Sequence, residues 1–123
     1  DRDGVLNKNI NGGYVGYPKD FRWISGAIKS IKLLKKKGFK IIVVTNQSGV
    51  ARGFFLKKDV ENLHSYMNEI LKKNSTKIDN FLFCETCYPS ICSIALSMRA
   101  KSLLDRAMLS LSICRNFLAP FLP

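Results

Sequence analysis

Apolar positions recur with helical spacing in two segments of the chain. Between residues 25 and 38 they fall three or four apart, which predicts one buried helix face formed by Ala27, Ile28, Ile31 and Leu34. Ser25 is placed to cap this helix, and Gly38 follows its last turn, where a left-handed residue is favoured. A second helix is predicted from 58 to 73, with an inner face formed by Val60, Leu63, Met67, Ile70 and Leu71. His64, in the same segment, is expected on the surface of that helix.

Two short apolar runs follow these helices in alternation. Residues 40–45 read Lys-Ile-Ile-Val-Val-Thr, a β-branched run that suits a strand buried on both faces. Residues 78–84 read as another strand. Helices alternating with strands indicate an α/β fold with a parallel sheet flanked by helices.

The chain divides into two unlike parts. Residues 1–84 carry the α/β pattern, whereas 85–123 are apolar without a pattern that predicts a fold. We therefore expect a partial α/β core over 1–84 and a divergent or degraded tail over 85–123. The length of 123 residues allows one domain with a single core.

Composition narrows the class of protein further. Apolar residues make up 46%, which argues against disorder, and no apolar run is long enough for a membrane span. The first residues lack the pattern of a secretory leader, so a cytoplasmic location is expected. The net charge of +11 rests largely on lysines of the predicted helices. These lysines form either a solvated face or a field that attracts an anionic substrate or nucleic acid.

Asp1-Arg2-Asp3-Gly4-Val5 is the first candidate site. Two carboxylates two residues apart point the same way on an extended segment, and such a pair can hold a divalent cation and supply a nucleophile and an acid/base. A surface turn at Gly4 is the alternative interpretation.

The second candidate site follows the predicted strand at 40–45. Thr45, Asn46, Gln47 and Ser48 place hydroxyl and amide groups at the carboxyl edge of the sheet, where α/β proteins bind ligands. Nearby glycines permit close approach to an anion, and Arg52 can pair with a phosphate. A polar strand-to-helix loop would show the same residues.

Together, these motifs resemble the haloacid dehalogenase superfamily, in the branch that contains D-glycero-D-manno-heptose 1,7-bisphosphate phosphatase and the histidinol-phosphate phosphatases. The resemblance covers about residues 1–84 and rests on four blocks: D-R-D-G-V at 1–5, G-Y-V at 13–15, F-R-W-I at 21–24, and V-V-T-N-Q-S-G-V-A-R-G at 43–53. It implies an incomplete Rossmann-like fold and a magnesium-dependent phosphomonoesterase that acts on a small phosphorylated sugar.

The resemblance also implies residue roles. Asp1 matches the nucleophile that forms an aspartyl-phosphate, and Asp3 matches the general acid/base. The Asp1 carboxylate and the Asp3 carbonyl would ligate Mg²⁺. Thr45 matches a hydroxyl that binds the transferring phosphoryl group. Further substrate contacts are expected from Asn46, Gln47, Ser48, Arg52, Asn11, Gly12, Gly13 and Tyr14.

The sequence also departs from the family pattern. The strand that precedes the nucleophile in the family is not present, nor are the later lysine and acidic metal motifs. A catalytically inactive remnant is therefore an alternative to an enzyme. Histidinol-phosphate phosphatase and polynucleotide 3′-phosphatase are further alternatives, although the G-Y-V and F-R-W-I blocks favour the sugar branch and make nucleic acid an unlikely partner.

Cysteines lie only in the last third of the chain. Cys84 and Cys87 form a C-x-x-C pair, and Cys92 follows five residues later. Such a set can bind a structural Zn²⁺ if a fourth ligand is supplied, and otherwise the cysteines are reduced thiols.

Overall fold

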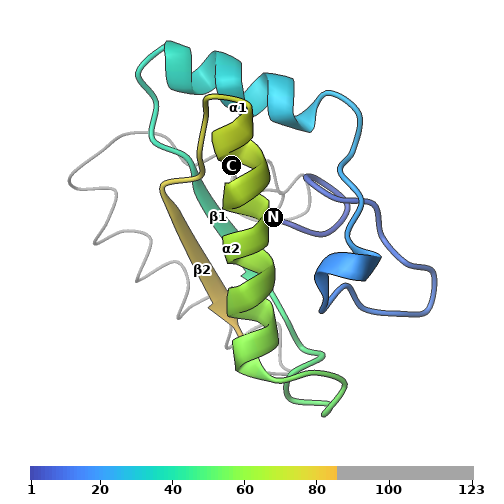
Figure 1. Cartoon of the computed structure of the whole chain (residues 1–123). Coiled ribbons are helices and arrows are strands. Elements are labelled where there is room, and N and C mark those ends of the chain that lie inside the picture. The colour runs from blue at the N-terminus through green and yellow to red at the C-terminus, as the bar shows by residue number, and fades with distance from the viewer. Residues whose placement is uncertain (86–123) are drawn as a thin grey trace, which may run out of the picture.

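The computed structural model describes residues 1–85, which form a partial α/β unit (Figure 1). A short 3-10 helix, η1 (Pro18–Asp20), precedes α1 (Ala27–Lys36), β1 (Ile42–Asn46), α2 (Lys57–Lys73) and β2 (Asn80–Cys84). The predicted alternation of helices and strands is thus confirmed. Apart from Glu85, the predicted tail at 85–123 lies outside the described residues.

The first helix ends as the sequence predicts but begins differently. Gly38 has φ = 87°, its N–H donates to the carbonyl of Lys35 at 3.0 Å, and the N–H of Phe39 donates to that of Leu34 at 3.1 Å. These two bonds form a Schellman motif, which needs a left-handed residue at this position. The predicted cap by Ser25 is wrong, because the N-cap is Gly26 and no side chain caps the helix.

The two strands pair in parallel and bury most of β1. Ile42 lies opposite Asn80, and Asn46 lies opposite Cys84. Ile42 and Val43 are successive residues that face opposite sides of the strand, and both are buried, as the β-branched run predicts. Because the strands are parallel, their carboxyl ends meet at one edge of the sheet.

Helix α2 supplies the largest share of the core and lies alongside the strand pair (Figure 1). Its first turn is held by Asp59, whose carboxylate accepts the N–H of Leu56 at 2.8 Å. Its second half is tied to the segment before β2 because Asn68 exchanges two hydrogen bonds with the backbone of Ile78, at 2.9 and 3.1 Å. The core cluster contains Val15, Phe21, Ile31, Ile41, Val43, Leu63, Met67, Leu71 and Ile78.

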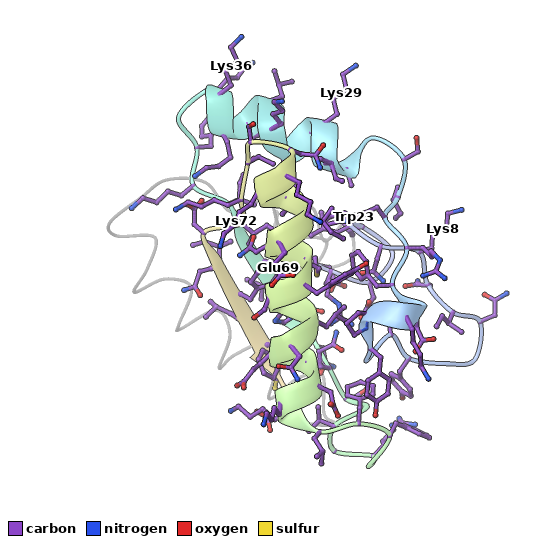
Figure 2. The ribbon with its side chains drawn as sticks, viewed as in Figure 1. Lys8, Trp23, Lys29, Lys36, Glu69 and Lys72 are labelled. Carbon is purple, nitrogen blue, oxygen red and sulfur yellow. The ribbon has the colours of Figure 1, made fainter. Side chains whose placement is uncertain are left out.

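The lysines of the helices lie on the outside of this core. Lys29 and Lys36 project from α1, and Lys72 lies on α2 (Figure 2); all three are exposed. Within residues 1–85, neither helix has the length and apolar character that crossing a membrane requires.

Candidate active site

The first motif folds into a tight turn. The carbonyl of Arg2 accepts the N–H groups of Val5, Leu6 and Asn7 at 2.9 to 3.3 Å, and the N–H of Gly4 donates back to Asn7 at 2.8 Å. Gly4 has φ = 78°, a conformation that other residues rarely adopt. The chain therefore turns at Gly4, and this turn fixes the backbone that carries the two aspartates.

The two carboxylates of this motif have different partners. Asp1 is half-buried, accepts the N–H of Arg2 at 2.7 Å through Oδ1, and lines an apolar cavity of about 180 Å³ beside α1 and β1. Asp3 Oδ1 accepts the side-chain amide of Asn7 at 2.9 Å, and Asp3 Oδ2 accepts that of Gln47 at 2.8 Å. Asp3 thus belongs to a hydrogen-bond network that reaches the second motif.

Gln47 connects the two motifs predicted from the sequence. Its side-chain amide donates to Asp3 and, at 3.1 Å, to the hydroxyl of Thr45. Gln47 and Thr45 are both 2% exposed. Asn46, at the end of β1, is exposed. The structure therefore brings Asp3, Thr45 and Gln47 together at the carboxyl edge of the sheet.

The loop after β1 turns back on itself beyond Gln47. The carbonyl of Ser48 accepts the N–H of Arg52 at 3.1 Å, and the carbonyl of Gly49 accepts that of Phe54 at 2.9 Å. Ser48 is half-buried, whereas Arg52 is exposed. The Arg52 side chain is therefore available to an anion in solvent, and its predicted phosphate contact stays a prediction.

An aromatic contact joins this loop to the loop at 11–14. Asn11, Gly12 and Gly13 are exposed, while Tyr14 is half-buried and stacks on Phe54 with ring centroids 5.1 Å apart. The ring of Tyr14 also meets the edge of Phe55 at 6.2 Å. The two loops expected to contact substrate are thus neighbours.

Arg2 is a site residue that the sequence analysis missed. It is fully buried, its Nε donates to Asp3 Oδ1 at 3.1 Å, and its Nη2 donates to both carboxylate oxygens at 3.0 Å. Nη2 also donates to the carbonyl of Val15 at 2.5 Å and to Gln47 Oε1 at 2.9 Å. Burial lowers the pKa of Arg2, and the adjacent Asp3 carboxylate opposes this shift.

His64 lies behind Arg2, so the prediction of a surface position is wrong. It is 5% exposed, stacks on Phe81 with centroids 4.2 Å apart, and has Nε2 at 3.5 Å from Arg2 Nη1. Burial, followed by the charge of Arg2, lowers its pKa to about 3. His64 is therefore neutral at pH 7, with Nε2 placed to accept from Arg2.

Glycine at position 49 is required by the packing between the two loops. A Cβ there would lie 2.5 Å from Phe55 Cζ and 3.2 Å from Tyr14 Cγ, and Phe55 is buried. We expect Gly49→Ala to lower the free energy of unfolding by about 1–3 kcal/mol, because overpacking forces side chains out of favoured rotamers. Urea unfolding of the purified variant measures this change.

A double substitution separates overpacking from other effects of the alanine. Phe55→Leu removes the ring atoms nearest to the new Cβ, so Gly49→Ala should cost at least about 1 kcal/mol less in that background. Strictly additive effects would contradict the steric explanation. Gly13→Ala is the matched control, since its Cβ would meet only the side chain of the exposed Ile10.

Oxygen ligands near the first motif fit a magnesium ion. Mg²⁺ commonly uses one or two carboxylates, keeps several waters and binds substrate phosphates. The half-buried Asp1 carboxylate and the Asp3 carbonyl provide donors of this kind, while the Asp3 carboxylate is engaged by side-chain donors. Within residues 1–85 no group of three or more His, Cys, Asp or Glu side chains is gathered for a metal.

The zinc prediction depends on residues that the structure does not describe. Cys84 ends β2 and is half-buried, and its carbonyl accepts the N–H of Gln47 at 2.8 Å. Cys87 and Cys92 lie outside the described residues. Zinc binding therefore stays a prediction.

Comparison with known proteins matches this chain to phosphatases. The family model described as polynucleotide kinase 3 phosphatase matches residues 1–94. The chain is 43% identical over 84 residues to a D-glycero-beta-D-manno-heptose-1,7-bisphosphate 7-phosphatase of Rhodopseudomonas palustris, covering 68% of this chain and 46% of the relative. It is 39% identical over 84 residues to a D-glycero-D-manno-heptose-1,7-bisphosphate 7-phosphatase of Chlorobaculum tepidum, covering 68% and 42%.

A solved structure supports the same assignment. The D,D-heptose 1,7-bisphosphate phosphatase of B. bronchiseptica, complexed with magnesium and phosphate, superposes with a TM-score of 0.73 at 25% identity, covering 85% of this chain and 59% of that one. The chain spans less than half the length of the two curated relatives named above. The motifs, the parallel α/β unit and these matches show that the chain belongs to the polynucleotide kinase 3 phosphatase family, within the haloacid dehalogenase superfamily of phosphatases.

Proposed function

We propose that this chain carries the nucleophile and the acid/base of a magnesium-dependent phosphomonoesterase that acts on a sugar bisphosphate of the heptose 1,7-bisphosphate type. The observation that carries the proposal is the chain of contacts from Asp3 Oδ2 through the Gln47 amide to the Thr45 hydroxyl, at 2.8 and 3.1 Å. These contacts support the proposal because they link the Asp3 carboxylate, which we assign as the acid/base, to the Thr45 hydroxyl, which we assign to phosphoryl binding. The matched relatives named as heptose-1,7-bisphosphate 7-phosphatases support the substrate class.

The proposed reaction has two steps on the residues of this chain. A carboxylate oxygen of Asp1 attacks the phosphorus, and the bond to the sugar oxygen breaks as Asp3 donates a proton to that oxygen. Asp3 then accepts a proton from water, which attacks the aspartyl-phosphate and releases inorganic phosphate and free Asp1. Bound Mg²⁺, held by the Asp1 carboxylate and the Asp3 carbonyl, would offset the charge between the anionic nucleophile and the anionic substrate.

Thr45 and the two loops have supporting roles in this proposal. The Thr45 hydroxyl would donate to a phosphoryl oxygen, and the exposed Arg52 would attract the second phosphate of a bisphosphate. The loop at 11–14 would contact the sugar, since Tyr14 stacks beside the loop after β1.

A polynucleotide 3′-phosphatase is the second candidate. The description of the matched family and the net charge of +11 favour it. A protein that binds nucleic acid through basic residues loses affinity for it steeply as the salt concentration is raised. A sugar phosphatase is not expected to show this salt-dependent binding to DNA.

A substrate panel tests these alternatives. The purified full chain is incubated with Mg²⁺ and, separately, heptose 1,7-bisphosphate, histidinol phosphate or a 3′-phosphorylated oligonucleotide, and phosphate release is measured. We expect the heptose bisphosphate to be hydrolysed with at least tenfold higher kcat/KM than the other two. Faster hydrolysis of the oligonucleotide would reverse the assignment, and no release from a folded chain would identify an inactive remnant.

A further inference from the structure

We propose that Arg2 is a positioning residue. It holds the Asp3 carboxylate in the orientation needed for proton transfer, and it fixes the position of that carboxylate relative to the two substrate loops. The proposal rests on the function proposed above, because it assigns the acid/base role to Asp3. Arg2 directly precedes Asp3 in the sequence.

The geometry of the fork supports the first part of the proposal. Nε and Nη2 of Arg2 both donate to Asp3 Oδ1, at 3.1 and 3.0 Å, and Nη2 also reaches Oδ2 at 3.0 Å. A planar guanidinium that meets a carboxylate through two nitrogens fixes the plane of the carboxylate as well as its distance. The Asp3 side chain therefore has little freedom to rotate.

The ion pair is buried on one side only. Arg2 has no exposed side-chain surface, whereas 29% of the Asp3 side chain is exposed. A buried arginine is costly unless its charge is paired. The buried cation thus holds the carboxylate from behind, while the exposed part of Asp3 faces the side from which a substrate can approach.

The remaining bonds of Arg2 explain how the network can survive a change in the proton on Asp3. Nη2 donates to Gln47 Oε1 and to the carbonyl of Val15 as well as to Asp3. When Asp3 gains a proton and becomes a weaker acceptor, these two oxygens remain as partners for the guanidinium. Arg2 therefore does not lose all of its acceptors in either half of the reaction.

The same bonds connect separate segments of the site. Val15 directly follows the loop at 11–14, Gln47 follows β1, and His64 Nε2 lies 3.5 Å from Arg2 Nη1 on the side of α2. One side chain thus contacts Gln47 in the loop after β1, Val15 beside the loop at 11–14, and His64 on the helix behind them. A displacement of Arg2 would change the position of Asp3 relative to Thr45 and to the loop that contacts the sugar.

Arg2→Lys is the first test, because lysine keeps the charge but cannot form the fork. In the full chain with Mg²⁺ and heptose 1,7-bisphosphate, we expect kcat to fall about 100-fold while KM changes less than threefold, since general acid/base catalysis commonly contributes 10²–10⁴-fold. The matched control is Arg22→Lys, an exposed arginine whose side chain, within residues 1–85, donates only to the backbone carbonyls of Lys19 and Phe21. Its kcat should match that of the unmodified chain.

A folded Arg2→Lys variant that retains kcat within threefold would overturn the proposal. A rise in KM at constant kcat would do the same, because it would assign Arg2 to substrate binding. Thermal unfolding monitored by circular dichroism establishes whether the variant is folded under the assay conditions.

NMR provides a readout that does not depend on activity. In the unmodified chain, we expect the Arg2 Nε–H and the Gln47 side-chain amide hydrogens to exchange slowly with water and to show contacts with the Asp3 side chain. Rapid exchange of the Arg2 Nε–H in the folded chain would overturn the proposed positioning even if Arg2→Lys fails to fold. If the unmodified chain hydrolyses no phosphomonoester, the proposed function fails, and the NMR result alone decides whether Arg2 holds Asp3.

Discussion

Asp1→Asn will reduce phosphate release from heptose 1,7-bisphosphate by on the order of 10³-fold or more, which is the scale seen when a nucleophile is removed from an enzyme. The amide that replaces the carboxylate is uncharged and a poor nucleophile. Asparagine has nearly the size of aspartate. In the unmodified chain the Arg2 N–H donates to Asp1 Oδ1 at 2.7 Å, and the side-chain carbonyl oxygen of asparagine can accept the same bond. The loss should therefore appear in turnover and not in folding.

The measurement compares initial rates of the two proteins at saturating substrate and Mg²⁺. Asp20→Asn is the matched control, because Asp20 is also half-buried but lies in η1, apart from the first motif. It should keep the rate of the unmodified chain within about twofold. Turnover by Asp1→Asn within tenfold of the unmodified chain would remove Asp1 from the nucleophile role and with it the proposed aspartyl-phosphate.

The architecture of residues 1–85 could be predicted because each element carries its own local signal. The apolar spacing around Ile31 predicts α1, and the continuous β-branched run around Val43 predicts β1, so helical periodicity places the first element and residue composition places the second. The left-handed conformation of Gly38 follows from the same logic, because the last turn of a helix favours glycine there. The cap by Ser25 failed because Gly26, one residue later, takes the N-cap position.

The second motif was predicted correctly in place but not in detail. Thr45, Asn46 and Gln47 lie at the carboxyl edge of the sheet, as their position after a parallel strand predicts. The sequence could not separate a side chain that faces solvent from one that is turned inward. Asn46 is exposed. Gln47 is only 2% exposed, because its side chain bonds to Arg2 and Asp3, more than forty positions away in the sequence.

Arg2 was missed for a similar reason. A cation between two carboxylates has the pattern of a surface turn, and nothing local indicates that its acceptors lie on three other segments. His64 did carry a usable signal, since it lies four residues after Val60 and three before Met67, on the buried face of α2. Its polar character outweighed that spacing in the sequence analysis.

The burial of His64 leads to the second large effect, a loss of stability in mild acid. Its pKa is lowered from 6.5 to about 3 in the folded chain, first by burial and then by the charge of Arg2. Between these two values the unfolded chain binds a proton at His64 that the folded chain does not, so the free energy of unfolding falls as pH falls below about 6.5. The slope from this one group starts at half of about 1.4 kcal/mol per pH unit at pH 6.5, where the unfolded His64 is half protonated, and approaches the full value below it, so the loss between pH 6.5 and 4.5 is about 2 kcal/mol.

Urea unfolding between pH 4.5 and 7.5 tests this expectation against His64→Gln, which cannot be protonated and keeps an oxygen that can accept from Arg2. Asp79 contributes to both proteins alike: although burial raises its pKa, hydrogen bonds from Lys35 and from the Ile41 N–H lower it, so its stabilisation is also lost in acid. The difference between the two proteins therefore isolates His64. The advantage in free energy of unfolding that the unmodified chain has over His64→Gln should shrink as pH falls from 6.5, because only the unmodified chain has to exclude a proton from this position. Parallel curves of unfolding free energy against pH would show that His64 is accessible to protons in the folded chain. The direction matters for the site as well, since a protonated His64 would place a second cation 3.5 Å from the guanidinium that holds Asp3.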